Sequence, residues 1–231
     1  SGQLGSSPSH EADLLHASIQ EHPLIAQLGA IAVVVAWLAV VTAIALLVRR
    51  RWPDQREWSR KVVHIGTGPV VLLAWWLQID RAVALPAAAL VTLATALNHR
   101  FRLLPAVEDV GRHSYGTIAY GGSITLLLAL YWPLQPLPVA AGVLVMACGD
   151  GLAGLLGPAL RSPRWRLLGQ GKSLAGTTGM AIASLLVLLA LAALAGISGQ
   201  TAPTWPALLL IAAIATALEQ LSGYGIDNLS V

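Results

Sequence analysis

The sequence has few charged residues and almost no cysteine. Asp, Glu, Lys and Arg make up 11% of its 231 residues and hydrophobic residues 56%, whereas soluble domains carry about 25% charged residues. The single cysteine, Cys148, excludes an internal disulfide and a cysteine-based metal site. Residues 1–23 lack a basic region and are polar, so they resemble neither a signal peptide nor a transit peptide. These shortages indicate a polytopic membrane protein, in which the lipid bilayer replaces much of the core.

Apolar segments separated by charged or Pro- and Gly-rich stretches predict the fold. We expect an all-α, polytopic transmembrane helix bundle of about seven spans, formed by one domain over residues 24–231 that follows a polar N-terminal segment over residues 1–23. The predicted spans are residues 24–48, 63–79, 82–98, 115–132, 138–158, 176–196 and 204–221.

The positive charges are distributed unevenly and predict the topology. Of the 14 Lys and Arg residues, six lie in residues 49–61, three in 99–113 and four in 161–172. With seven spans these three loops share one side, which the positive-inside rule makes cytoplasmic. The N-terminus is then outside and the C-terminus cytoplasmic. Because the net charge of +3 comes from these loops, we expect the partner to be the lipid bilayer and not nucleic acid.

Asp150 lies deep in the apolar segment 138–158. A carboxylate inside a membrane span is energetically costly and marks a candidate functional site. Gly154 and Gly157 follow at i+4 and i+7, on the same helix face, where they let another helix or a ligand approach closely. The structural alternative is a buried Asp that caps a neighbouring helix. Cys148 is interpreted as a small apolar residue and not as a nucleophile.

Two cationic groups precede apolar segments on the predicted cytoplasmic side. Arg60, Lys61 and His64 form the first, and Gly171-Lys172-Ser173 forms the second. Helix N-termini favour phosphate, so we expect both groups to contact a nucleotide. The alternatives are snorkelling anchors for Arg60 and Lys61 and an interfacial histidine for His64. A Walker A loop is excluded, because Arg166 stands where that pattern needs glycine.

Acidic residues are expected at the same face. Glu219 lies at the end of the last predicted span, where a carboxylate opposes the helix dipole and needs a metal or a cation as partner. Asp227 and Asn228 follow, either as oxygen ligands or as a plain turn. With Asp150 these residues are the metal-ligand candidates. Cations, helix starts and carboxylates in one cytoplasmic layer suit a Mg²⁺-nucleotide.

Four motifs in order resemble the phytol kinase/dolichol kinase family of membrane-embedded polyprenol kinases. They are Arg60-Lys61-x-x-His64, Gly149-Asp150-x-x-Ala153-Gly154-x-x-Gly157, Gly171-Lys172-Ser173-x-x-Gly176-Thr177, and Glu219 followed by Asp227-Asn228. The resemblance covers residues 58–231, and the short chain and the Tyr115-Gly116 segment are closest to the phytol kinases. It implies CTP as phosphoryl donor, phytol as acceptor and a place in tocopherol biosynthesis. Such chains often continue after the Asp-Asn motif, so we expect a further C-terminal helix that this sequence lacks.

We therefore expect a transmembrane kinase domain whose site faces the cytoplasm or the plastid stroma. Residues 60, 61, 172 and 173 would bind the phosphates together with His64, Gly154, Gly171 and Gly176. Asp150 and Lys172 are the predicted catalytic residues, and Asp150 either binds Mg²⁺ or another divalent cation or accepts the proton of the alcohol. Two alternatives remain at this point: a CTP-dependent cytidylyltransferase acting on a lipid phosphate, and a small-solute transporter. The sequence leaves the oligomeric state open.

Overall fold

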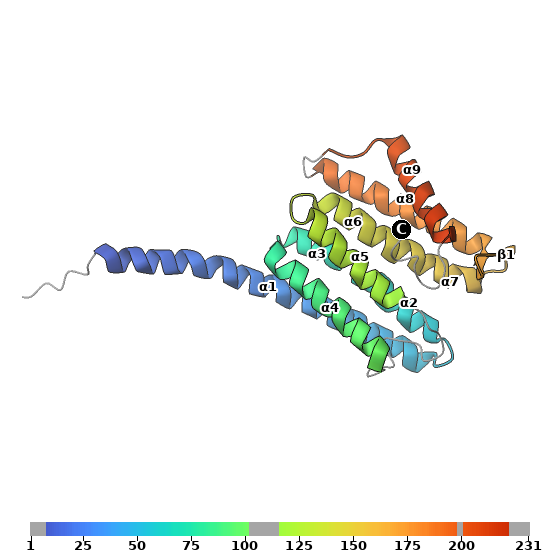
Figure 1. The fold of residues 1–231 in the computed structure, drawn as a ribbon, viewed down its shortest axis with the longest axis horizontal. Helices are drawn as coiled ribbons and strands as arrows, with labels where there is room; N and C mark the ends of the chain where they lie inside the picture. The colour runs from blue at the N-terminus through green and yellow to red at the C-terminus, as the bar shows by residue number, and fades with distance from the viewer. Residues whose placement is uncertain (1–7, 102–115, 198–200, 222–231) are drawn as a thin grey trace, which may run out of the picture.

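The computed structural model describes residues 8–101, 116–197 and 201–221, and these form a helical bundle (Figure 1). The helices of the first half are α1 (Pro8–Arg51), α2 (Arg56–Thr67), α3 (Val70–Trp76), α4 (Arg81–Phe101) and α5 (Gly116–Tyr131). The second half contains α6 (Pro136–Leu144), the π-helical turn η1 (Val145–Asp150), α7 (Gly151–Ala159), α8 (Leu174–Ile197) and α9 (Trp205–Leu221). Strands β1 (Arg164–Leu167) and β2 (Gln170–Ser173) lie between α7 and α8.

Within the part of the chain that the structure describes, four helical segments are long and apolar enough to cross a membrane: Leu24–Arg51, Arg81–Asn98, Pro136–Ala159 and Leu174–Ile197. Two shorter apolar helices, Gly116–Tyr131 and Trp205–Leu221, accompany them. Long apolar side chains on these helices remain exposed to the outside of the bundle, which suits contact with lipid. The chain is therefore an integral membrane protein, and the predicted helical class is confirmed. The count of seven spans and their direction remain predictions.

One predicted span is not a single helix. Residues 63–79 were expected to form one span, but the chain forms α2 up to Thr67 and then α3 from Val70. Pro69 has no N–H group to continue the helical hydrogen-bond pattern, so the helix breaks there. The short α3 and the amphipathic α2 together occupy the place of the predicted span. The break places the polar residues of α2 and the apolar residues of α3 at different levels of the bundle.

The segment before α8 forms a β-hairpin, which the sequence did not predict. The sequence indicated only that Gly171-Lys172-Ser173 precedes an apolar segment, whereas Gln170–Ser173 forms strand β2, which pairs antiparallel with β1. Leu168 and Gly169 both have positive φ (48° and 79°), the conformation of a two-residue hairpin turn. Lys172 and Ser173 therefore project from a strand that leads directly into α8.

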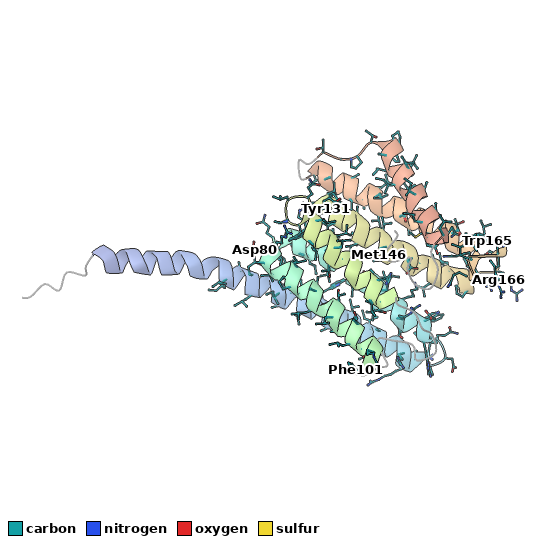
Figure 2. All side chains as sticks on the ribbon, in the orientation of Figure 1. Asp80, Phe101, Tyr131, Met146, Trp165 and Arg166 are labelled. Atoms are coloured by element: carbon teal, nitrogen blue, oxygen red, sulfur yellow. The ribbon has the colours of Figure 1, made fainter. Side chains whose placement is uncertain are left out.

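The two ends of the bundle differ in chemistry. Figure 2 labels Trp165 and Arg166 of the hairpin at one end and Asp80 near the other. The connection between α1 and α2, which is flanked by arginines at positions 49–51 and 56, lies at the same end as the hairpin (Figure 1). At the opposite end the indole N–H of Trp132 donates to the carbonyl of Ile79 at 2.8 Å, within an apolar cluster that also contains Val139 and Val143. The cationic end carries the site described next.

Candidate active site

Asp150 forms the centre of a buried charged cluster. The Nζ atom of Lys61 lies 2.8 Å from Asp150 Oδ2 and 3.2 Å from the Asp150 carbonyl oxygen. Both residues are 8% exposed. The Lys61–Asp150 pair joins α2 to η1, two segments 89 positions apart in the sequence. Since an unpaired charge inside a membrane bundle is costly, each of the two residues compensates the charge of the other.

His64 completes this cluster from the next turn of α2. Its Nε2 atom lies 3.2 Å from Asp150 Oδ2 and 3.2 Å from the carbonyl oxygen of Met146. Both neighbours accept hydrogen bonds, so Nε2 carries the proton. Lys61 and His64 both contact Oδ2, and no hydrogen bond to Oδ1 comes from the part of the chain that the structure describes. The second carboxylate oxygen can therefore accept a proton or a ligand.

Glycines on η1 and α7 make room for this arrangement. A Cβ atom on Gly154 would lie 2.4 Å from Lys61 Cε, so the lysine side chain crosses the helix where a side chain is missing. A Cβ atom on Gly151 would likewise overlap Ile65 of α2. Further along the same face, Gly157 faces Ser173 and Gly176, which lets the start of α8 pack closely on α7. The stripe at positions 150, 154 and 157 therefore serves helix packing on both sides, as the spacing predicted.

The sequence reasoning missed two polar residues of this site, Tyr120 and Thr67. The Tyr120 ring packs on the His64 ring with centroids 4.3 Å apart, and its hydroxyl donates to the His64 carbonyl at 3.2 Å. The Thr67 hydroxyl lies 3.2 Å from the Tyr120 hydroxyl. Both residues stand in apolar runs, and only their polarity inside a predicted span could have pointed to them. Together they fix the position of the imidazole.

An apolar cavity of about 450 Å³ ends at this cluster. Residues of α1, α3, α4 and α5 form its walls, among them Val34, Val71, Ala88 and Ile124. The polar lining residues come mainly from α2 and η1 and are Arg60, Lys61, His64, Thr67, Thr95, Thr117, Tyr120 and Asp150. The volume lies in the range of small-molecule sites, roughly 300–1,000 Å³. Such a cavity suits a molecule with a long apolar body and one polar end.

A second buried ion pair connects the hairpin to α9. The Lys172 Nζ atom lies 2.5 Å from Glu219 Oε1 and 2.6 Å from the Glu219 carbonyl oxygen. Gln220 donates from Nε2 to Glu219 Oε2 at 2.6 Å and to the Thr177 hydroxyl at 2.9 Å. The expectation that Glu219 needs a partner at the helix end is confirmed, and Lys172 is that partner. Thr177 and Gln220 were not among the predicted site residues.

The start of α8 is largely satisfied by the protein itself. The N–H groups of Leu174, Ala175 and Gly176 donate to the Pro163 carbonyl, the Ser162 hydroxyl and the Ser173 hydroxyl, at 3.0, 3.1 and 3.2 Å. The Ser173 hydroxyl thus caps this helix. Any phosphate contact at this end depends on the Lys172 side chain and not on free N–H groups.

The remaining predicted residues are placed as follows. Arg60 lines the cavity and pairs with Glu57 one turn earlier, at 2.6 Å. Gly171 is exposed on β2, with nothing near its missing Cβ. Asp227, Asn228 and Tyr115 lie outside the described residues. Within the described ranges, no group of three or more His, Cys, Asp or Glu residues is positioned to hold a metal ion.

The Asp150 cluster and the end of strand β2 both contact α7. Lys61 crosses this helix at Gly154, and Ser173, which follows Lys172, contacts it at Gly157. Three residues of helix separate the two contacts, a distance of roughly 4.5 Å along the axis. One cationic end of the bundle therefore carries two lysine–carboxylate pairs, and the cavity opens onto the first of them.

Comparison with characterised proteins finds two similar sequences. The chain is 39% identical over 214 residues to the phytol kinase of Synechocystis sp., a match that covers 92% of this chain and 91% of that enzyme. It is 29% identical over 142 residues to the chloroplastic farnesol kinase of Arabidopsis thaliana, covering 55% of this chain and 45% of that protein. No protein-family model and no solved structure matches the chain.

The geometry predicts strong coupling between Lys61 and Asp150. Replacing Lys61 by Met leaves the Asp150 carboxylate buried without its main partner, and breaking a buried pair in this way costs about 3–5 kcal/mol. Adding Asp150→Asn to Lys61→Met removes the isolated charge and should restore most of the lost stability. Thermal unfolding of the wild type, both single variants and the double variant in detergent measures this coupling. Additive losses in the double variant would show that the two residues do not depend on each other.

Proposed function

The chain belongs to the phytol kinase family, and we propose that it transfers the γ-phosphoryl group of CTP to the hydroxyl of a long-chain isoprenoid alcohol, foremost phytol. One observation carries the proposal: an apolar cavity inside the membrane bundle ends at the carboxylate of Asp150. The alcohol would place its tail in the cavity and its hydroxyl at Asp150. This end of the bundle also carries the cations that a triphosphate requires.

In this mechanism Asp150 orients the alcohol and takes its proton. The alcohol oxygen forms a bond to the γ-phosphorus while the bond from that phosphorus to the β,γ-bridging oxygen breaks, and CDP leaves. The hydroxyl proton passes to Asp150 Oδ1, the oxygen not occupied by Lys61 and His64. Lys61 lies beside the reacting oxygen and stabilises the negative charge that develops there. Since phosphoryl transfer depends mainly on positioning and charge neutralisation, these groups suffice on the acceptor side.

The nucleotide would bind at the Lys172–Glu219 pair. This pair is 2.5 Å long and largely buried, and it offers one cation and one carboxylate. Mg²⁺ is held in kinases by one or two carboxylates together with the phosphates of the substrate, and this donor set fits that pattern. Bound Mg²⁺ would neutralise the phosphate charge. Lys172 would then exchange its contact with Glu219 for one with the phosphates, while Glu219, with Asp227 and Asn228 as further candidates, would hold the metal ion.

The Asp150 carboxylate provides the first test. Asp150→Asn keeps the shape of the side chain and an oxygen that can accept from Lys61, but it cannot accept a proton. We expect a loss of kcat on the order of a hundredfold or more, with the protein still folded in detergent. The assay is transfer of label from γ-labelled CTP to phytol. Turnover within threefold of the wild type would make Asp150 a structural residue.

Lys172 tests the nucleotide side. Lys172→Met should raise the KM for CTP, lower kcat, or both, and leave prenol binding unchanged, because Lys172 is on the hairpin and not in the cavity lining. The control is Arg161→Ala, an exposed arginine of the same connection that we interpret as a membrane anchor. Kinetics with CTP and phytol varied separately distinguish the two effects. A Lys172 variant with altered prenol selectivity and normal CTP kinetics would refute this placement.

The sidedness of the site follows from the same proposal. We place the hairpin end of the bundle in the cytoplasm, or in the plastid stroma of a plant cell, because the basic loops gather there. In a Cys148→Ala background, a cysteine at exposed position 166 should react with an impermeant reagent from the cytoplasmic side. A cysteine at exposed position 134, between α5 and α6, should react only from the other side. Labelling in oriented vesicles decides this, and reaction of both positions from one side would contradict the topology.

A further inference from the structure

The cavity is long, and one of its walls is regular. Along α4 the lining residues recur on one helix face from Ala84 to Thr95, through Ala88 and Val91. The eleven residue steps from Ala84 to Thr95 span roughly 17 Å at 1.5 Å per residue. The antiparallel α5 supplies the adjoining wall, and the Thr92 and Thr125 hydroxyls lie 3.1 Å apart between the two helices. This wall therefore runs from the polar cluster toward the opposite end of the bundle.

The end of the cavity farthest from Asp150 is closed by the core. Its lining residues there, Ala74, Ile79 and Leu128, are each 6–7% exposed and belong to the apolar cluster around Trp132. Trp132 itself is 2% exposed and is fixed by its hydrogen bond to the Ile79 carbonyl. A chain that enters from the polar end thus meets a packed floor. The depth of the cavity is set by side chains and not by the thickness of the membrane.

We infer that this cavity, whose far end is closed by the core, selects acceptors by the length of the isoprenoid tail and favours about four isoprene units, with Ala84 and Ala88 of α4 as the specificity-determining positions. An extended hydrocarbon chain advances roughly 1.25 Å per bond, so four units span about 20 Å and three units about 15 Å. The wall of roughly 17 Å is longer than three extended units, so it covers three units and part of a fourth, with the alcohol end at the polar cluster. Much longer polyprenols cannot place their whole tail against this wall. This inference rests on the proposed prenol kinase function.

The geometry of α4 should allow the length of the accepted tail to be changed in steps of about one isoprene unit. One turn of α4, from Ala84 to Ala88, rises about 6 Å, close to the length of one extended isoprene unit, roughly 5 Å. A larger side chain at Ala84 fills the bottom of the cavity, and one at Ala88 fills it one turn nearer to the polar cluster. Each step should remove the space for about one unit. Neither substitution touches the charged cluster.

The test measures kcat/KM for geraniol, farnesol and geranylgeraniol, which have two, three and four units and the same unsaturated chemistry. Ala84→Leu should lower the ratio of kcat/KM for geranylgeraniol to kcat/KM for farnesol at least tenfold. The kcat/KM for farnesol itself should stay within threefold of the wild type. Ala88→Leu should also lower the ratio of farnesol to geraniol at least tenfold. The matched control is Ala89→Leu, the exposed neighbour on the same helix that does not line the cavity, which should leave both ratios unchanged.

Binding of tritiated geranylgeraniol to the purified protein in detergent, with the shorter alcohols as competitors, is measured in parallel. If the wild type binds prenols with the expected dependence on length but phosphorylates none, the kinase proposal fails and the length selection stands. If the wild type is an active kinase and both variants leave the ratios unchanged, or lower kcat/KM equally for all three alcohols, the length selection is wrong and the kinase proposal stands.

Discussion

The site depends on one interaction, the ion pair between Lys61 and Asp150 inside an apolar bundle. A carboxylate at this depth needs a cation, and only an element from elsewhere in the chain can bring one. The amphipathic α2 does so, and Gly154 provides the space through which the lysine passes. In the π-helical turn η1 the carbonyl of Asp150 accepts from Lys61 Nζ and the carbonyl of Met146 faces His64 Nε2. Turns of this kind are frequent at functional sites.

This arrangement lets two substrates of opposite solubility meet. The cavity is built from apolar residues of α1, α3, α4 and α5 and is suited to a lipid tail. The hairpin and the end of α9 present a lysine and a carboxylate at the cationic end of the bundle. α7 lies between the two and contacts both Lys61 and Ser173. In our proposal the phosphoryl group passes from the nucleotide at the hairpin to the alcohol at Asp150, while the lipid tail stays in the apolar cavity.

Much of this could be predicted from the sequence, because a charge within an apolar run has few explanations. Asp150 was identified in this way, Lys61 by its place before an apolar segment, and Glu219 by its place at a helix end. The glycine spacing after Asp150 correctly indicated close packing. The pairing of each lysine with its own carboxylate was not predicted, since sequence spacing does not show which distant elements meet. Tyr120 was missed because a tyrosine in an apolar helix is usually only a packing residue. The hairpin was missed because its strands are short and polar, and its turn residues Leu168-Gly169 give a weak signal.

The central claim is that the Asp150 cluster phosphorylates an isoprenoid alcohol. The most direct measurement incubates the purified full chain with phytol, Mg²⁺ and CTP labelled either at the γ- or at the α-phosphate, and identifies the lipid product by mass spectrometry. The account predicts phytyl monophosphate that carries the γ-label and none of the α-label. A lipid product that contains CMP and the α-label, or no labelled lipid with any nucleoside triphosphate, would contradict it.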